Sequence, residues 1–404
     1  MGTQDKKKGL LEGIQILDLA DEKASFCSKL LADLGARVIK IEKPGGDPSR
    51  RIGPFLEGVP HTEKSFFFYC NNTNKLGITL DLEHEEAKRI FFKLLKKTDT
   101  VIETFHPGYL KEIGLGFDVL REVNPKLILV SVTAFGKKGP RSRDKSCDLV
   151  ASAVGGSMYL NGSPSTPPLK PFGVQSYYTA SLFAAVGILL ALRKRAYAGK
   201  GEHIDISLQE AVVSVVDHAM IRFFYEKVIA ERQGRLYWNN DFCILPCKDG
   251  HILLTLSLRW DILVEWIKSE GMAGDLQEEK YLEEEYRIAH MDHIIEIFEQ
   301  WTKRHTTQEL FELGQLMHFP WARIYSMQEV LNNPQLKARE FFTAVEHPEI
   351  NKSIFYPGLP YKLTSSLDRW KRAPLIGEDN VQVYQNEVGL SKEEFERLAT
   401  LKVI

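Results

Sequence analysis

Apolar residues occur in short continuous runs in the first third of the chain, with amphipathic segments between them. Such runs cover residues 13–19, 37–42, 100–105 and 126–133. They are typical of strands that are buried on both faces of a parallel sheet. Residues 24–34 and 83–97 instead place their apolar side chains at helical spacing. Because strand, helix and strand within about 30 residues form a βαβ unit, the pattern predicts a parallel sheet in a Rossmann-like α/β domain.

The longest apolar run, residues 180–192, leads into a basic segment, a glycine and an alternating segment at 203–207. This order is typical of a helix that ends at Gly199 and is followed by a strand. The run is shorter than the roughly 18 to 20 residues that span a bilayer, so we expect a buried core helix and no membrane partner. Free N–H groups and the helix dipole point out of a helix N-terminus, so a ligand is expected near residues 175–177.

The second half of the chain is richer in charged helical segments. We expect a long helical region from 211 to about Lys227, helices within 260–304 and a last helix at 391–401. Residues 247–255 are typical of a β-hairpin, with Asp249 and Gly250 as a type I′ turn.

Composition limits the classes of function. The chain has 404 residues, enough for two domains, and a net charge of -2, which argues against a nucleic-acid partner. Five scattered cysteines and a polar N-terminal segment without an apolar signal core indicate a reducing, cytoplasmic location. The turn after the first strand has no GxGxxG motif, so no dinucleotide is expected. Cys243 and Cys247 have no second ligand pair, so no metal site is expected either.

Several longer motifs carry a resemblance to a known family. The segments LLADLGARVIKIEKPGGDPSR, at 30–50, and GILLALRKRAYAGKGEHIDISLQEA, at 187–211, resemble the family III CoA-transferases, as do residues 72–81, 134–140, 319–339 and 372–377. That family includes formyl-CoA and carnitine CoA-transferases and α-methylacyl-CoA racemase. The resemblance covers nearly the whole chain.

The resemblance implies a fold in two domains. A large Rossmann-like domain would comprise residues 9–210 and 341–404, and a small α+β domain would comprise residues 236–318. A linker helix at 211–235 and a return linker at 319–340 would join them. In this family two chains interlock as a dimer.

The family's nucleophile is an aspartate at the start of the central helix, and ungapped alignment from Gly199 places Tyr177 there. The turn after the first strand, residues 21–26, is also shorter than the family's and lacks its Gly-Pro pair. A phenol with a pKa near 10 is a poor substitute for a carboxylate nucleophile. Tyr177 is therefore interpreted as a space-filling residue in a site that has lost its catalytic activity. The racemases use a histidine near Asp148 together with that aspartate, and this pair is absent as well.

These departures favour one subunit of a two-subunit enzyme, as in succinyl-CoA:benzylsuccinate CoA-transferase. A paralogous partner would supply the aspartate, and coenzyme A would be the transferred group, moved from an acyl-CoA such as succinyl-CoA to a carboxylic acid. Three alternatives stay open: an active homodimer that uses another carboxylate, such as Asp21 or Asp148; a CoA-binding regulator without activity; and a structural partner without a ligand.

Lysines near the ends of the predicted strands are candidates for the CoA phosphates, since open α/β sheets bind ligands there. By resemblance, Lys43 and Lys75 fall where the family contacts CoA, and Lys111 and Lys137 do so more loosely. The alternative for each is a solvated surface lysine. Phe105 would either stack on adenine or pack in the core. His106, His218, His251 and His318 have no partner motif and are interpreted as structural.

Overall fold

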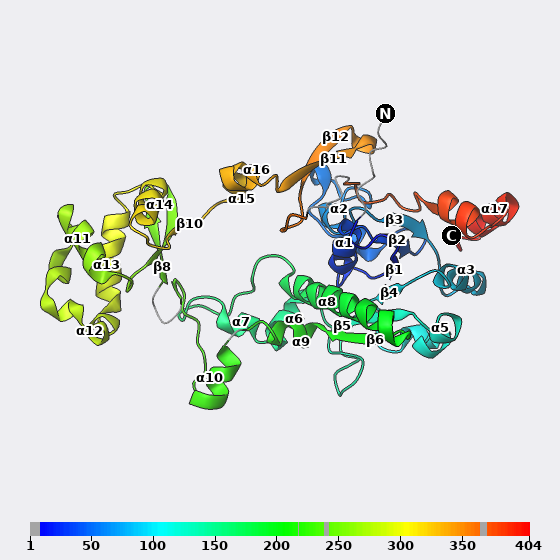
Figure 1. Cartoon of the computed structure of the whole chain (residues 1–404), viewed down its shortest axis with the longest axis horizontal. Coiled ribbons are helices and arrows are strands. Elements are labelled where there is room, and N and C mark those ends of the chain that lie inside the picture. Colours follow the sequence, from blue (N-terminus) through cyan, green and yellow to red (C-terminus); the bar gives the residue numbers. More distant parts are fainter. Residues whose placement is uncertain (1–8, 217, 238–241, 364–369) are drawn as a thin grey trace. The chain divides into compact units, whose positions relative to one another are not determined.

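The computed structural model describes residues 9–216, 218–237, 242–363 and 370–404. It divides into two compact units (Figure 1). The first unit comprises the chain up to Met158, Lys170–Val228 and Arg339–Ile404, and the second comprises Tyr159–Leu169 and Ile229–Ala338. Tyr159–Leu169, which the sequence assigned to the large domain, therefore belongs to the second unit.

A six-stranded parallel sheet forms the centre of the first unit, in the order β3-β2-β1-β4-β5-β6. Its strands are β1 (Gln15–Leu19), β2 (Arg37–Glu42), β3 (Leu76–Thr79), β4 (Thr100–Glu103), β5 (Ile128–Thr133) and β6 (His203–Ser207). The predicted parallel α/β sheet is thus confirmed, and β3 is a strand that the apolar pattern missed. The chain moves outward from β1 to β3 and then returns to β4, so the strand order reverses between β1 and β4.

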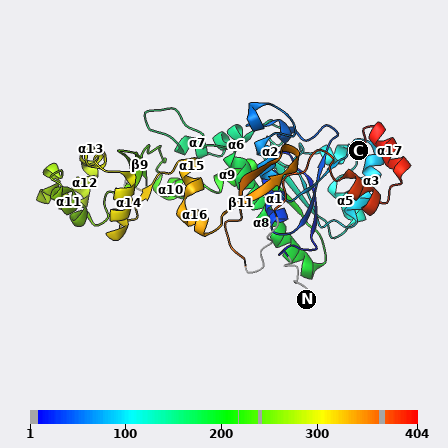
Figure 2. The same ribbon diagram turned by 90° about the horizontal axis from the view of Figure 1, so that it is seen from above.

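Helices cover both faces of this sheet (Figure 2). One face packs against α1 (Ser25–Asp33), α8 (Gln175–Ala198) and α9 (Leu208–Val213). The other packs against α3 (Glu85–Leu95), α5 (Phe117–Val123) and α17 (Lys392–Thr400). Alternate residues of one strand serve the two cores, as Val101 and Ile102 do on β4.

Shorter elements complete the first unit. They are α2 (Phe66–Asn71), α4 (Tyr109–Glu112), α6 (Asp148–Val154), α10 (Ala219–Glu226), β11 (Phe342–His347) and β12 (Lys352–Pro357). α7 (Ser157–Leu160) lies where the chain passes from one unit to the other. The predicted continuous helix from 211 to Lys227 is wrong, because the structure has separate helices α9 and α10 there.

The central helix α8 starts earlier than the apolar run predicted. Residues 175–177 form its first turn, and it ends as expected at Gly199, whose φ of 69° suits glycine. Among the described helices, α8 is the one long and apolar enough to cross a membrane, but only as judged by length and composition. One side of it, including Ala180, Ala184 and Ile188, is buried against the parallel sheet.

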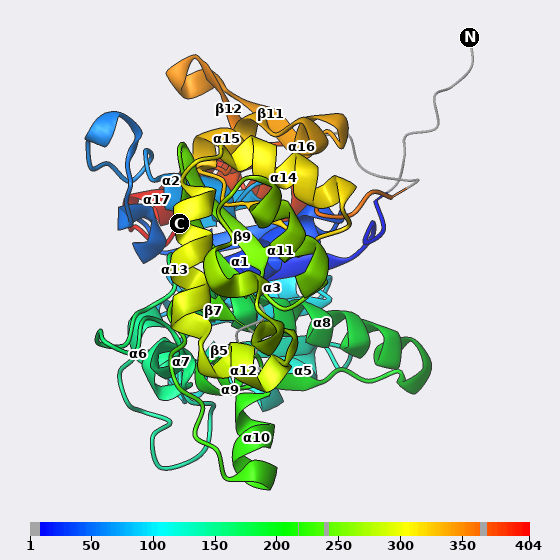
Figure 3. The same ribbon diagram turned by 90° about the vertical axis from the view of Figure 1, so that its left-hand side faces the viewer.

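The second unit has an antiparallel sheet in the order β10-β9-β8-β7, formed by β7 (Leu236–Tyr237), β8 (Phe242–Cys247), β9 (Gly250–Thr255) and β10 (Ala322–Arg323). Its helices are α11 (Trp260–Ser269), α12 (Glu284–Ala289), α13 (Met291–Thr302), α14 (Thr307–Leu316), α15 (Met327–Asn332) and α16 (Pro334–Ala338) (Figure 3). The core contains Phe298, Trp301 and Trp321.

The predicted hairpin between β8 and β9 is confirmed, but its turn is not. Cys247 pairs with Gly250, so Lys248 and Asp249 form the loop. Neither of them has the positive φ that a type I′ turn requires.

Candidate functional site at the carboxyl edge of the parallel sheet

Open α/β sheets bind ligands outside the carboxyl ends of their strands, where the strand order reverses. Here this point lies between β1 and β4. The loop after β1 is joined to the end of β4, because the Asp21 N–H donates to Thr104 Oγ1 at 2.9 Å. The first turn of α8 reaches α1 through Phe26 and Tyr178, whose rings meet edge-on at 4.9 Å. The β1–α1 loop and the residue in the nucleophile position therefore belong to one region.

Tyr177 is buried, and its hydroxyl oxygen accepts a hydrogen bond of 3.0 Å from the Asp148 N–H. Burial raises the pKa of the phenol well above its usual value, and the charge of Glu22 raises it further. The hydroxyl consequently keeps its proton at neutral pH. A protonated, buried phenol cannot take the place of an ionised carboxylate nucleophile.

Asp148 fills the N-terminus of α8. Its Oδ1 accepts hydrogen bonds from the Ser176 N–H at 3.0 Å and from Ser176 Oγ at 2.5 Å. Its Oδ2 lies 2.7 Å from Lys170 Nζ. The N–H group of Ser176 is therefore already used by a carboxylate of the same chain. The ligand expected near residues 175–177 stays a prediction.

Glu22 is a further carboxyl group in this region, and the sequence reasoning missed it. Its Oε2 atom is buried without a hydrogen-bond partner, whereas the neighbouring Asp21 is held by Lys23. Burial raises the pKa of Glu22, as does the charge of Asp21, while Lys23 lowers it. Its sequence signal was its place in the turn after the first buried strand, which is also the turn that departs from the family's pattern.

Lys75, which the sequence predicted to contact CoA, is buried. Its Nζ donates to Asp18 Oδ2 at 2.9 Å, to Asn72 Oδ1 at 2.7 Å and to the Ser25 carbonyl at 3.0 Å. Burial lowers its pKa to about 8 against the opposing effect of Asp18. An ammonium has three donors, so a phosphate would have to displace one of these partners. The geometry gives no support to a CoA contact at Lys75.

Lys43 and Phe105 are linked in space through Glu83 and Tyr109. Lys43 Nζ lies 2.8 Å from Glu83 Oε1, and the Tyr109 hydroxyl donates to the same oxygen at 2.9 Å. The Tyr109 ring lies 4.6 Å from the ring of Phe105. Lys43 is exposed, so a phosphate can reach it, and its contact with CoA stays a prediction.

The other two predicted lysines lie further along this edge. Lys111 is exposed on α4. Lys137 Nζ lies 3.5 Å from both Ser131 Oγ and His203 Nε2, and its N–H donates to Asp205. Burial and the charge of Lys137 lower the pKa of His203 to about 4, so this imidazole is neutral. CoA contacts at Lys111 and Lys137 also stay predictions.

Cys243 and Cys247 lie on β8, where burial raises the pKa of each thiol to about 11. Across the described part of the chain, no group of three or more His, Cys, Asp or Glu side chains is arranged to hold a metal ion.

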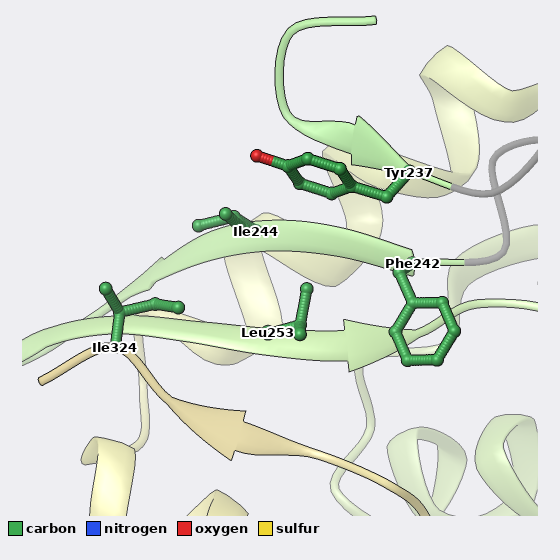
Figure 4. Close-up of a pocket in the computed structure, with 5 residues that line it drawn as sticks. All are labelled: Tyr237, Phe242, Ile244, Leu253 and Ile324. Carbon is green, nitrogen blue, oxygen red and sulfur yellow. The ribbon is translucent and has the colours of Figure 1, made fainter. Parts of the chain in front are cut away.

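A cavity of about 370 Å³ lies on the second unit's sheet (Figure 4). Its lining residues are Tyr237, Phe242, Ile244, Leu253 and Ile324. Ile244 and Leu253 alternate along their strands with residues of the core, so they point to the opposite sheet face. This lining suits a hydrocarbon group and offers no charged side chain to a carboxylate or a phosphate.

Comparison with known proteins finds relatives along nearly the whole chain. Residues 11–380 match the model of the family described as CoA-transferase family III. A solved structure, a CAIB/BAIF family protein from Brucella suis, superposes with a TM-score of 0.85 at 26% identity, covering 94% of this chain and 99% of that one.

Two curated relatives are each named as one subunit of a CoA-transferase. The chain is 31% identical to a subunit of succinyl-CoA:(R)-benzylsuccinate CoA-transferase from Thauera aromatica, covering 91% of this chain and 92% of the relative. It is also 31% identical to the beta subunit of succinyl-CoA–L-malate CoA-transferase from Chloroflexus aurantiacus, covering 98% of both. A formyl-CoA:oxalate CoA-transferase from Streptomyces avermitilis is 29% identical over 98% of this chain and 99% of its own.

Proposed function

Because this chain belongs to CoA-transferase family III, we propose that it is the subunit without a nucleophile in a two-subunit enzyme. The enzyme moves CoA from an acyl-CoA, such as succinyl-CoA, to a carboxylic acid, which in one relative is the aromatic acid benzylsuccinate. A paralogous partner subunit supplies the aspartate, and this chain completes the fold and part of the pocket wall. Both subunits would act in the cytoplasm.

The reaction then runs on the partner's aspartate. Its carboxylate attacks the thioester carbonyl, the C–S bond breaks, and an acyl-aspartyl anhydride and the CoA thiolate form. The thiolate attacks the aspartyl carbonyl, which releases the donor acid and leaves an aspartyl-CoA thioester. The acceptor carboxylate attacks this thioester to form a second anhydride, and the thiolate then attacks the acceptor's carbonyl. The new acyl-CoA leaves, and the aspartate is free again.

The observation that carries this proposal is the reciprocal bonding between Asp148 and the first turn of α8. The Asp148 carboxylate binds Ser176 while its N–H binds Tyr177, so both groups are committed within the chain. Asp21, the other alternative carboxylate, is paired with Lys23. This pairing speaks against an active homodimer that uses either aspartate.

The exposed side of α8 supports a protein partner. It presents large apolar side chains along the helix: Leu182, Phe183, Val186, Leu189 and Leu190. Their exposed fractions range from 38% for Leu189 to 61% for Leu190. A contiguous apolar face of this kind is typical of a protein–protein contact. A paralogous subunit is the partner that the two-subunit relatives favour.

The test is to express the chain alone and together with an Asp-bearing paralogue, and to measure native mass and CoA transfer. We expect a mixed oligomer that is active and a single chain that is not. Replacing the paralogue's aspartate by alanine should abolish transfer, whereas Tyr177→Phe should leave the rate within about twofold. Val186→Lys should weaken assembly, and Arg193→Ala, at an exposed polar position of the same helix, is its control.

Transfer by the purified single chain at a rate comparable with the pair would contradict the proposal. Tight binding of CoA by the single chain, with no transfer in any pair, would favour the regulator instead.

A further inference from the structure

Not every carboxyl group around Tyr177 has a lysine as its ion-pair partner. Asp21 is paired with Lys23, and Asp148 is paired with Lys170. Asp148 Oδ2 also lacks a hydrogen bond, but it has the ion pair with Lys170. Among the described residues of this group, Glu22 is the carboxyl without an ion pair, and its buried Oε2 has no hydrogen-bond partner. Buried polar atoms are almost always satisfied, so an unsatisfied carboxyl oxygen where the strand order reverses points to a missing ligand.

We propose that Glu22 binds the carboxyl group of a small carboxylic acid by sharing one proton with it, at the carboxyl edge of this chain's parallel sheet. The proposal rests on the proposed function only for its choice of ligand, since the reaction there interconverts carboxylic acids and their thioesters. It requires no catalysis by this chain, and no covalent bond forms or breaks.

The surroundings of Glu22 favour a carboxyl group that keeps its proton. Asp21 and Lys23 act on it from its own loop, Asp47 acts from the segment after β2, and Tyr177 lies on α8. Asp47 is itself paired with Lys40 at 3.0 Å. Burial and the two aspartates raise the pKa of Glu22, whereas Lys23 and a backbone hydrogen bond lower it. A proton held in this way can be donated to an anionic oxygen.

Tyr177 provides a second donor. Its oxygen accepts from the Asp148 N–H and still carries its own proton, because burial raises the pKa of the phenol. Two O–H donors suit the two oxygens of one carboxylate. An organic cation would fit a bare carboxylate but not a neighbouring phenol that donates.

The experiment is calorimetric titration of the full-length chain with succinate, at pH 5.5 and pH 7.5, in buffers of different ionisation enthalpy. We expect binding to weaken with rising pH, by up to about tenfold per pH unit above the pKa of Glu22, with uptake of a proton at the higher pH. Succinamide, which lacks a carboxylate, should not bind.

Variants separate the proposed contact from a structural role. Glu22→Gln keeps a donor but cannot titrate, so binding should persist and depend on pH only through the ionisation of succinate itself. Glu22→Ala should weaken binding more than tenfold, and Tyr177→Phe several-fold. Glu12→Gln, at an exposed carboxyl elsewhere, should match the unaltered chain. Thermal unfolding of each variant verifies that it is folded.

The proposal is overturned if succinate does not bind, if it binds without proton uptake, or if Glu22→Gln retains the original pH profile. None of these outcomes depends on transfer by the two-subunit enzyme. If the two subunits together transfer CoA but this chain alone does not bind succinate, this inference is rejected and the proposed function is unaffected. Conversely, if this chain binds succinate with proton uptake but forms no active enzyme with a paralogue, the inference is supported and the proposed function is rejected.

Discussion

Two polar clusters lie side by side at the carboxyl edge of the parallel sheet, and they differ in how completely their groups are paired. In the first cluster, Asp18 receives hydrogen bonds from Lys75, Ser28 and the Ala20 N–H. Lys40 is bound to Asp47 and to the Ala20 carbonyl. In the second cluster, around Tyr177, the Glu22 carboxyl keeps an oxygen without a partner.

The difference distinguishes support of the fold from binding. A buried charge whose donors or acceptors are all used inside the chain stabilises one arrangement and has nothing left for a ligand. A buried polar atom without a partner costs free energy unless something outside the chain satisfies it. Lys75, chosen from the sequence as a ligand contact, falls in the first class, and Glu22, which the sequence reasoning overlooked, falls in the second.

The largest expected effect comes from breaking the balanced cluster. Lys75→Met leaves the buried Asp18 carboxylate without its cation, and we expect a loss of about 3–5 kcal/mol in the free energy of unfolding. Denaturant unfolding followed by circular dichroism measures it. Lys43→Met, which breaks an exposed pair, is the control and should cost less than about 1 kcal/mol. Equal losses in the two variants would remove the distinction between the clusters.

An intermediate effect is expected within the second cluster. Tyr177→Phe removes the acceptor of the buried Asp148 N–H, so the free energy of unfolding should fall by about 1–3 kcal/mol. Tyr197→Phe, on the same helix but 79% exposed, should be neutral when measured in the same way. A neutral Tyr177→Phe would mean that this hydrogen bond does not hold the first turn of α8 in place.

The smallest effect is a pH dependence. Folding raises the pKa of Glu22 above its ordinary value of 4.5. Between that ordinary pKa and the raised one, the folded chain therefore binds more protons than the unfolded chain. Stability attributable to Glu22 therefore falls as the pH rises through this window and stays lower above it. Glu22→Gln should be more stable than the unaltered chain at pH 8, by about 1 kcal/mol or less, and gain nothing at pH 4. Thermal unfolding at both values tests this, and a gain that is equal at both would contradict the assignment.

Much of the fold could be predicted from the sequence because it depends on local patterns. The apolar runs at β1, β2, β4 and β5 and the Gly199 end of α8 were predicted correctly. β3 was missed because its residues, Leu76–Thr79, include a glycine and a threonine and form no continuous apolar run. The break between α9 and α10 was missed because both flanking segments have helical spacing. The hairpin turn was placed one residue late because Asp249-Gly250 is a strong turn signal that the observed register does not use.

The sequence by itself determined the alternation of strands and helices, the family, and the presence of a tyrosine where the family has an aspartate. Only the tertiary structure decided which charged groups meet. Lys75 finds Asp18 across 57 residues, and Ser176 finds Asp148 across 28. Secondary structure follows from periodicities of a few residues, whereas the pairing of buried charges depends on how whole elements pack. For that reason only the packing shows that Lys23, Lys40 and Lys170 pair with aspartates while Glu22 Oε2 has no hydrogen-bond partner.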